Sequence, residues 1–254
     1  PHNFEPGYLG PITLSHALAQ SINTVAARLA DEVGRDAVAA TARRLGIASP
    51  INTDPAMALG TTQVTPLEMA TAYDSFANGG RRVSPYGIER IQTSGGRVLY
   101  QHRPAQQPQA IANPPLSELD QMLRGVIATG TGVRAAIGGY DLAGKTGTTS
   151  DFKDAWFCGF TGGFTTVVWM GRDDATPMRG VTGGSAPVDF WRGFMTTALR
   201  RIPHGPIPAG PAPPAPVAPP AETPPLVGEP PAAVPQGEPP APPAEPDSNN
   251  TPLF

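Results

Sequence analysis

The spacing of hydrophobic residues predicts three helices in the first third of the chain. The first begins near Thr13 or Ser15. Its hydrophobic positions recur every three or four residues, at Leu14, Leu18, Ile22, Val25, Ala26 and Leu29. A second helix is expected at about 35–45 and ends at Gly46. The third has the clearest start, because residues 65–68 read Thr-Pro-Leu-Glu, which combines a threonine cap, a first-turn proline and a capping-box glutamate.

The segments that follow predict a β-hairpin and two more helices. Strands at 86–93 and 97–101 are separated by Ser-Gly-Gly, which favours a hairpin turn. Ser117 begins a fourth helix, and Pro187 begins the last one. The residues expected to face inward from this last helix are Phe190, Trp191, Phe194, Met195 and Leu199.

An antiparallel sheet is predicted between these last two helices. Three segments have the composition of strands, at 142–149, 155–161 and 164–171. Two glycines join the second segment to the third, and a connection this short requires antiparallel pairing. The fold class is therefore α/β of the α+β type, an antiparallel β-sheet flanked by helices.

Composition divides the chain near residue 202. Residues 203–254 hold 20 of the 33 prolines, five acidic residues and no lysine or arginine. A segment with so little hydrophobic surface cannot offset the entropy of folding, so we expect a disordered proline-rich acidic tail. The net charge of the chain is −3, and removing the five acids leaves residues 1–202 at +2. A body so close to neutral argues against nucleic-acid binding.

The remaining composition predicts no metal, no cofactor and no membrane span. The four histidines lie far apart, without the spacing of metal ligands. Cys158 is the only cysteine and is expected to be a buried thiol on a strand. The uncharged segment 155–171 contains several glycines and threonines, which suit paired strands better than a spanning helix. The chain begins at Pro1 without a methionine, so we expect it to be part of a longer protein.

Lys145 is one of only two lysines, and it belongs to two overlapping patterns. Residues 139–146, from Gly139 to Thr146, match the phosphate-loop pattern G-x-x-x-x-G-K-S/T. Such a loop binds nucleotides only where a helix follows, whereas the residues after Lys145 are mostly threonine and glycine and favour a strand. The other interpretation is a Lys-Thr-Gly triplet at 145–147 on an edge strand that lines a cleft. We favour this second interpretation.

Two motifs together resemble those of a known enzyme family. Ser21-Ile22-Asn23 and the triplet at 145–147 are similar to the S-x-N and K-T-G motifs of the penicillin-binding serine D,D-peptidases. Further segments resemble class A, bifunctional members of this family, at 12–14, 21–26, 58–60, 65–70, 76–80, 143–149 and 154–157. The resemblance implies an incomplete serine D,D-peptidase or β-lactamase-like transpeptidase fold, with 1–202 as the C-terminal portion of the domain.

The resemblance implies peptidoglycan cross-linking by D,D-transpeptidation. In this family the serine of an S-x-x-K motif attacks D-Ala-D-Ala stem peptides, and β-lactams acylate the same serine. Family members act at the periplasmic face of the bacterial inner membrane, with an anchor and a glycosyltransferase domain that are not in this sequence. The resemblance also implies partners in cell-wall synthesis. The only S-x-x-K match here, Ser150 to Lys153, follows the K-T-G strand and suits a connection between strands. We therefore expect the fragment alone to form no acyl-enzyme.

Two residues receive catalytic roles from the resemblance. Ser21 would belong to the hydrogen-bonded path that carries a proton to the leaving group. Lys145 would supply positive charge to that path and to the terminal carboxylate of the substrate. The nucleophilic serine and the basic lysine of S-x-x-K are absent from this sequence.

Four more residues receive substrate-binding roles. Asn23 would bind the substrate amide, and the hydroxyls of Thr146 and Thr148 would hold the carboxylate. Gly147 would leave room for a substrate that lies antiparallel along the strand. The backbone N–H of Thr148 would be one oxyanion-hole donor. The alternative to an enzyme is a catalytically inactive module that keeps the fold for binding to the cell wall or to a partner.

Overall fold

The computed structural model describes residue 3 and residues 9–208. The segment 209–254, which holds most of the predicted tail, lies outside the described residues. The helices are α1 (Leu14–Ala19), α2 (Asn23–Val33), α3 (Arg35–Leu45), α4 (Pro66–Ala77), α5 (Pro115–Ala128) and α6 (Ala186–Ala198). The short 3-10 helices are η1 (Met57–Leu59) and η2 (Val133–Ala135). The strands are β1 (Arg90–Gln92), β2 (Val98–Gln101), β3 (Ala143–Thr148), β4 (Asp154–Thr161) and β5 (Phe164–Gly171).

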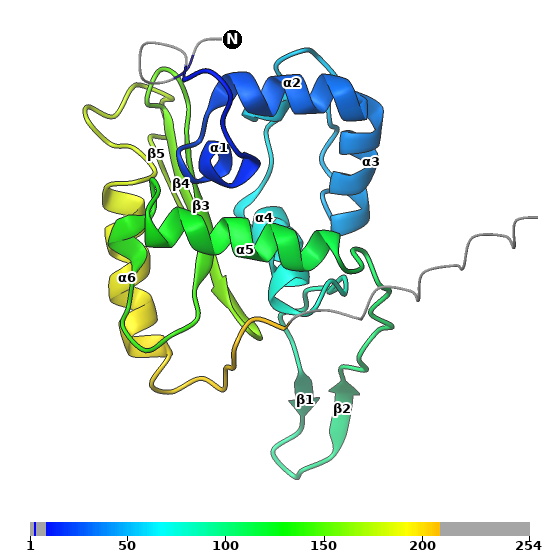
Figure 1. The fold of residues 1–254 in the computed structure, drawn as a ribbon. Helices are drawn as coiled ribbons and strands as arrows, with labels where there is room; N and C mark the ends of the chain where they lie inside the picture. The colour runs from blue at the N-terminus through cyan, green and yellow to red at the C-terminus, as the bar shows by residue number, and fades with distance from the viewer. Residues whose placement is uncertain (1–2, 4–8, 209–254) are drawn as a thin grey trace, which may run out of the picture. The chain divides into compact units, whose positions relative to one another are not determined.

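The main sheet has the order β3-β4-β5, and both of its strand pairs are antiparallel. Side chains alternate along β4, so Phe157 and Phe160 point to opposite faces. The ring of Phe157 packs edge-on against Trp191 of α6 at 5.1 Å, and the ring of Phe160 lies 6.1 Å from Phe76 of α4. Helix α5 lies against β3 (Figure 1). The predicted fold class, an antiparallel sheet flanked by helices, is confirmed.

The single helix predicted from residue 13 to residue 29 is wrong. Thr13 caps α1 as expected, because its hydroxyl accepts a hydrogen bond from the N–H of His16. The helix then ends, since Ser21 has a φ of 56°, in the left-handed region that non-glycine residues rarely adopt. Helix α2 begins again at Asn23. Hydrophobic residues keep their helical spacing across this break, so the periodicity alone did not reveal it. Ser21 therefore lies on a turn between two helices.

The predicted capping box of α4 is confirmed. The hydroxyl of Thr65 accepts from the N–H of Glu68, and the Glu68 carboxylate accepts from the N–H of Thr65 at 2.8 Å. The same carboxylate accepts from the N–H groups of Ala48 and Ser49, in the loop after α3. These hydrogen bonds lower the pKa of Glu68 to about 2. The cap thus also ties α4 to α3, which spans the residues predicted for it.

The last helix presents a narrower hydrophobic face than the sequence predicts. Trp191, Met195 and Leu199 are buried against the sheet as expected. Phe190 and Phe194 were predicted to face inward, but they are 63% and 47% exposed. Successive residues are rotated by about 100° around the helix axis. The two phenylalanines therefore lie on a different side of the helix from the face that Trp191 and Met195 bury against the sheet. The inward prediction for these two residues is wrong.

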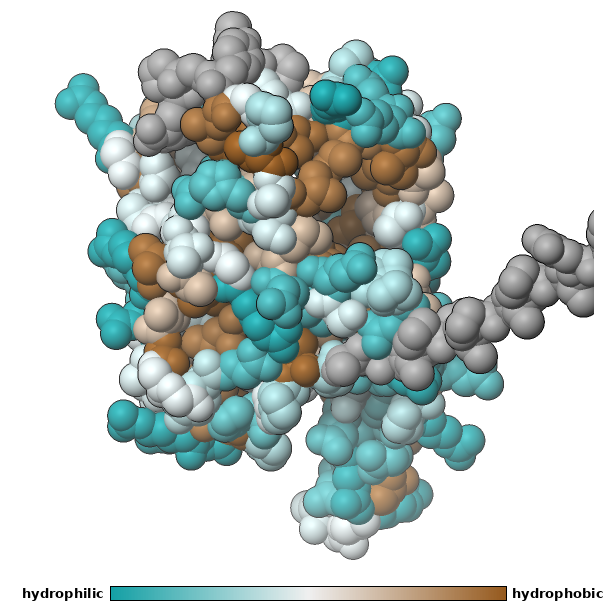
Figure 2. Space-filling model, viewed as in Figure 1, coloured by the Kyte–Doolittle hydropathy of each residue, from teal (hydrophilic) through white to brown (hydrophobic). Residues whose placement is uncertain are grey.

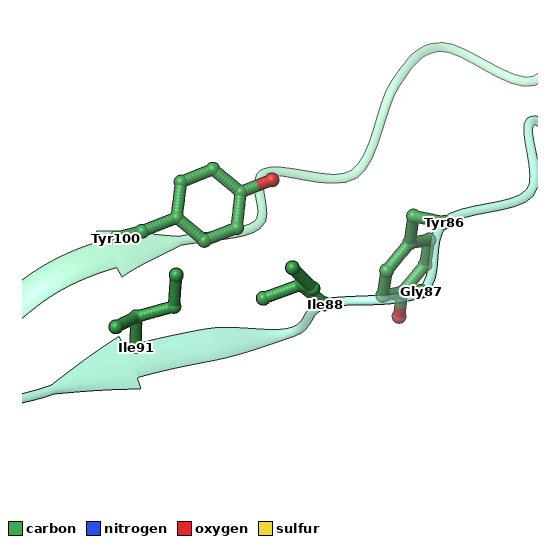
Figure 3. A pocket seen from close by; sticks show the side chains of 5 residues that line it. All are labelled: Tyr86, Gly87, Ile88, Ile91 and Tyr100. Atoms are coloured by element: carbon green, nitrogen blue, oxygen red, sulfur yellow. The ribbon is translucent and has the colours of Figure 1, made fainter.

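The predicted hairpin forms a separate two-stranded sheet. Ile91 of β1 is paired with Tyr100 of β2, and both side chains stand on one face with Ile88 and Tyr86 (Figure 3). These residues line a hollow of about 300 Å³. The strand starts at Arg90, later than predicted. Hydrophobic side chains reach the surface of the hairpin in Figure 2.

The chain after α6 returns to the sheet. Gly205 pairs with Gly162 at the β4–β5 turn, and its carbonyl accepts from the Thr161 hydroxyl at 3.0 Å. Ile207 is buried, and its N–H donates to the Asp141 carboxylate at 2.9 Å. The packed part of the chain therefore extends at least to Ile207, five residues beyond the boundary at 202 that composition predicts.

A buried carboxyl group lies close to this segment. Asp141 forms a two-pronged ion pair with Arg124 of α5, at 2.7 and 2.9 Å. Asp120, one helical turn before Arg124, is 1% exposed, and neither of its carboxylate oxygens has a hydrogen-bond partner among the described residues. Burial raises the pKa of Asp120 to about 7, with Arg124 opposing the shift and Asp141 adding to it.

A turn at 182–185 packs on β3. The N–H of Gly183 donates to the Thr148 hydroxyl at 2.9 Å. A Cβ atom at Gly183 would lie 2.5 Å from the carbonyl oxygens of both Gly147 and Trp156. Backbone atoms of β3 and β4 therefore occupy the space that any side chain at this position would need.

Replacing Asp120 with asparagine should remove part of the pH dependence of stability. An unfolded aspartate ionises near pH 4, whereas the folded Asp120 keeps its proton up to about pH 7. The free energy of unfolding of the wild type should therefore fall as the pH rises from about 4 to about 7. This fall should be steeper than that of Asp120→Asn, by up to about 1.4 kcal/mol per pH unit. Urea unfolding from pH 4 to 8 measures both slopes, with Asp173→Asn as a control for loss of one exposed carboxylate. Equal slopes would refute the burial argument.

Replacing Gly183 with alanine should destabilise the protein. The new methyl group collides with backbone that cannot move without shifting β3, so we expect a loss of about 1–3 kcal/mol. Gly193, inside α6, is the matched control, because its Cβ would meet nothing within 4 Å. Gly193→Ala should be neutral or stabilising by up to about 1 kcal/mol. Chemical denaturation compares the two variants, and a Gly183→Ala protein as stable as the wild type would contradict this packing.

Candidate active site

The side chain of Lys145 brings the two sequence motifs together. Lys145 lies in the middle of β3, and its ammonium donates to the hydroxyl of Ser21 at 2.8 Å. It also donates to the carbonyl oxygen of Thr146 at 3.0 Å. The contact with Ser21 joins residues 124 positions apart in the sequence. The structure therefore places the Ser-x-Asn turn directly beside the Lys-Thr-Gly strand.

The loop after α5 holds the turn that carries Ser21. The N–H of Thr131 donates to the carbonyl of Ala19 at 3.0 Å, and the side chain of Gln20 donates to the carbonyl of Thr129 at 3.2 Å. Gly130 lies so close that a Cβ there would be 2.3 Å from the Ala19 oxygen. The end of α1 is thus fixed by backbone contacts immediately before Ser21.

Burial controls the charge of the lysine. Desolvation lowers the pKa of Lys145 to about 8. Its cross-strand neighbour is Cys158 of β4, whose pKa burial raises to about 12, so the thiol stays neutral. No carboxylate among the described residues contributes to the lysine pKa. The described residues therefore leave this ammonium group available to an anionic ligand.

The two threonines of β3 project hydroxyl groups at the same site. The Thr146 hydroxyl lies 2.6 Å from the hydroxyl of Thr131, and either one can be the donor. The Thr148 hydroxyl accepts from the N–H of Gly183 at 2.9 Å. A hydroxyl that accepts a hydrogen bond keeps its own proton for donation. Thr148 can therefore donate to an incoming oxygen without losing its contact with Gly183.

Gly147 and Asn23 are the remaining predicted residues. Gly147 is paired with Trp156, and a Cβ on the glycine would come within 3.3 Å of the tryptophan Cβ. The sheet itself therefore favours glycine at this position. Asn23 is the first residue of α2, two positions after Ser21, and is half-buried. Asn23 therefore follows closely the residue that Lys145 contacts.

The nucleotide-binding interpretation of residues 139–146 is wrong. Lys145 lies inside a strand, and the next element is the antiparallel strand β4 rather than a helix. Helix N-terminal amides, which a phosphate loop needs, are therefore missing after the lysine.

The Ser-x-x-Lys match at 150–153 lies in the turn between β3 and β4, as expected. The hydroxyl of Thr149 accepts from the N–H groups of Lys153 and Asp154, which closes this turn. The Lys153 ammonium pairs with Asp151 at 3.4 Å. Nothing in this turn provides the helical spacing that a serine–lysine pair of that motif needs.

Thr131, which contacts Thr146, was missed by the sequence argument. For Gly183, which contacts Thr148, the sequence indicated a turn at 183–185 but did not distinguish a turn near the cleft from an ordinary loop. A signal for Thr131 was present, since the sequence Thr-Gly-Thr-Gly follows α5 directly at 129–132. Cys158 is a buried free thiol on β4, as predicted.

Two further features were sought in the described residues, a cluster of metal ligands and a membrane-spanning helix. Within the described part of the chain, no three histidine, cysteine, aspartate or glutamate side chains are grouped so that they could hold a metal ion. No helix in the same residues is long and hydrophobic enough to span a bilayer.

Comparison with other sequences gives consistent matches to one enzyme family. Residues 2–172 match the penicillin binding protein transpeptidase domain. Penicillin-binding protein 1A of Aquifex aeolicus is 37% identical over 207 residues, which are 80% of this chain and 28% of that protein. The Neisseria lactamica protein of the same name is 40% identical over 210 residues, which are 80% of this chain and 26% of that protein. The chain therefore spans little more than a quarter of the length of these relatives.

Solved structures agree with the sequence matches. Penicillin-binding protein 1A from Haemophilus influenzae superposes with a TM-score of 0.73 at 31% identity, over 81% of this chain and 37% of that one. PonA1 from Mycobacterium tuberculosis, in complex with penicillin V, superposes with a TM-score of 0.71 at 25% identity, over 82% and 64% of the two chains. Because the family match covers more than half of the sequence, the chain belongs to the penicillin-binding protein transpeptidase domain family.

Proposed function

We propose that this chain supplies the substrate-carboxylate side of a D,D-transpeptidase active site that cross-links peptidoglycan. The observation that carries the proposal is the 2.8 Å contact between Lys145 and Ser21 at the sheet edge. A buried ammonium with no carboxylate partner among the described side chains suits an anionic peptide end. The hydroxyls of Thr146 and Thr148 lie on the same strand and can donate to the same carboxylate.

The open edge of β3 suits a peptide substrate. Among the described residues β3 pairs only with β4, so the other edge of the strand can accept an extended peptide. Gly147 adds no side chain to obstruct such a peptide, and the N–H of Thr148 would be an oxyanion-hole donor. Asn23 would bind the substrate amide from the start of α2. The substrates would be D-Ala-D-Ala stem peptides, and β-lactams would bind as their mimics.

Proton transfer would run through Ser21 and Lys145. The ammonium donates to the serine hydroxyl, which leaves the serine proton free to move to a leaving amine. The attacking serine and its neighbouring base would come from an S-x-x-K motif in a longer protein, because the only match in these 254 residues lies in a turn. That protein would act outside the cytoplasm, on the periplasmic face of the inner membrane, and would carry a glycosyltransferase domain and cell-wall synthesis partners.

A non-catalytic binding module is the second candidate. The observation that favours it is that the only S-x-x-K match in these 254 residues lies in the turn between β3 and β4. Such a module would still bind peptide carboxylates at Lys145, but it would form no covalent adduct with a β-lactam. Covalent labelling therefore separates the two candidates.

Lys145→Met should suppress labelling by a fluorescent penicillin in the longer protein that contains this chain. Loss of one preorganised electrostatic group in an active site typically costs about 10²–10³ in rate, and we expect a loss of that size. The measurement is the rate of adduct formation on a denaturing gel. The chain of 254 residues by itself should give no adduct, because the serine at 150 lies in a turn.

The second lysine provides the matched control for this experiment. Lys153 lies in the β3–β4 turn, with its side chain 43% exposed. Lys153→Met should label at the wild-type rate. Equal labelling of wild type and Lys145→Met would contradict the proposed role of Lys145. A wild-type protein that is not labelled would favour the non-catalytic module.

The pH dependence of labelling should report the charge of Lys145. The ammonium form is the active one, and its pKa is lowered from 10.5 to about 8, so the charge is present below pH 8 and lost above it. The second-order rate of adduct formation should therefore fall above about pH 8. In Lys145→Arg the labelling rate should fall only at a higher pH, because arginine keeps its charge. If the rate falls at the same pH in both proteins, a group other than Lys145 causes the fall.

A further inference from the structure

We propose that Thr131 is a positioning residue of this site, which directs the hydroxyl proton of Thr146 towards the substrate carboxylate. The inference rests on the proposed function and deepens it. Thr131 belongs to neither of the two motifs, and it lies in the loop between α5 and η2.

Thr131 contacts all three elements that build the site. Its N–H holds the carbonyl of Ala19 at the end of α1, just before Ser21. Its hydroxyl lies 2.6 Å from that of Thr146 on β3. Its carbonyl oxygen packs against the turn at 182–185, since a Cβ at Gly184 would come within 2.7 Å of it. One residue therefore bridges the serine turn and the lysine strand.

The glycines on either side of Thr131 lie close to neighbouring elements. Gly130 lies against the Ala19 carbonyl, and a Cβ at Gly132 would come within 3.2 Å of the Phe157 ring. The loop is thus packed closely between α1 and β4, with glycines where space is lacking. Thr131 is the residue between these glycines, and its side chain is aimed at Thr146.

The direction of the Thr131–Thr146 hydrogen bond decides what Thr146 can do. A threonine hydroxyl has one proton. If Thr146 donates to Thr131, it can only accept from a ligand, and its lone pairs repel a carboxylate. If Thr131 donates, the Thr146 proton is free to bind the carboxylate. The Lys145 ammonium, 3.5 Å from the Thr146 oxygen, can only donate, and Thr146 can accept from it in either arrangement, so the ligand decides between the two.

An arriving carboxylate selects the arrangement in which Thr131 donates to Thr146. Hydroxyls in series polarise one another, so a chain from Thr131 to Thr146 to the carboxylate strengthens each hydrogen bond. Removing the Thr131 hydroxyl would leave Thr146 without this donor. The effect should be specific to ligands that carry the negative charge, whereas a purely structural role would affect every ligand alike.

The experiment compares two ligands in the full-length protein that contains this chain. Thr131→Val, which keeps the shape and removes the hydroxyl, should slow acylation by benzylpenicillin about fivefold, the size expected for one neutral hydrogen bond. Acylation by the uncharged methyl ester of benzylpenicillin should change less than about twofold. Thr131→Ser, which restores the hydroxyl, should recover the benzylpenicillin rate.

Thr129 provides the matched control in the same loop. Its hydroxyl donates to the Gly125 carbonyl of its own helix, so Thr129→Val should react with both ligands at wild-type rates. Equal slowing of both ligands in Thr131→Val, or no rescue by serine, would overturn the positioning role while leaving the proposed function in place. Failure of the wild type to react with benzylpenicillin would refute the proposed function, and this inference with it.

Discussion

The site depends on one buried cation and on the groups that hold it. Lys145 reaches from β3 to the Ser21 hydroxyl and to the carbonyl oxygen of Thr146. Taking an ammonium out of water is costly unless polar atoms replace the lost solvent. The two oxygens do so only in part, and burial therefore lowers the pKa of the lysine. The neighbouring elements therefore serve to keep these few atoms within hydrogen-bond distance.

Local signals in the sequence predicted most of the fold. The capping box of α4 and the three strands of the main sheet were found because capping and alternation depend on neighbouring residues. The break at Ser21 was missed, since hydrophobic spacing continues through a left-handed residue. Phe190 and Phe194 were misplaced, because aromatic residues occur on two adjoining faces of α6 and only packing against the sheet distinguishes them.

In the candidate site, too, local motifs were recognised from the sequence, whereas contacts made by packing were not. Lys145 and Ser21 could be found from the motifs, and the structure brings them into contact. The contacts of Thr131 and Gly183 with β3 could not, because they depend on how loops 15 and 35 positions away pack on the sheet. Asp120 was missed for a related reason, since a carboxyl group in a helix gives no sign in the sequence that its oxygens will be buried without partners.

The most direct test of this account is the titration of the two lysine ammonium groups in the chain itself. Nitrogen-15 NMR resolves them, and Lys153→Arg assigns the signals, because the sequence has only these two lysines. The account predicts that the Lys145 signal titrates near pH 8 and that Ser21→Ala shifts its midpoint. A midpoint near 10.5, unchanged by the serine substitution, would show an exposed ammonium without a partner and would contradict it.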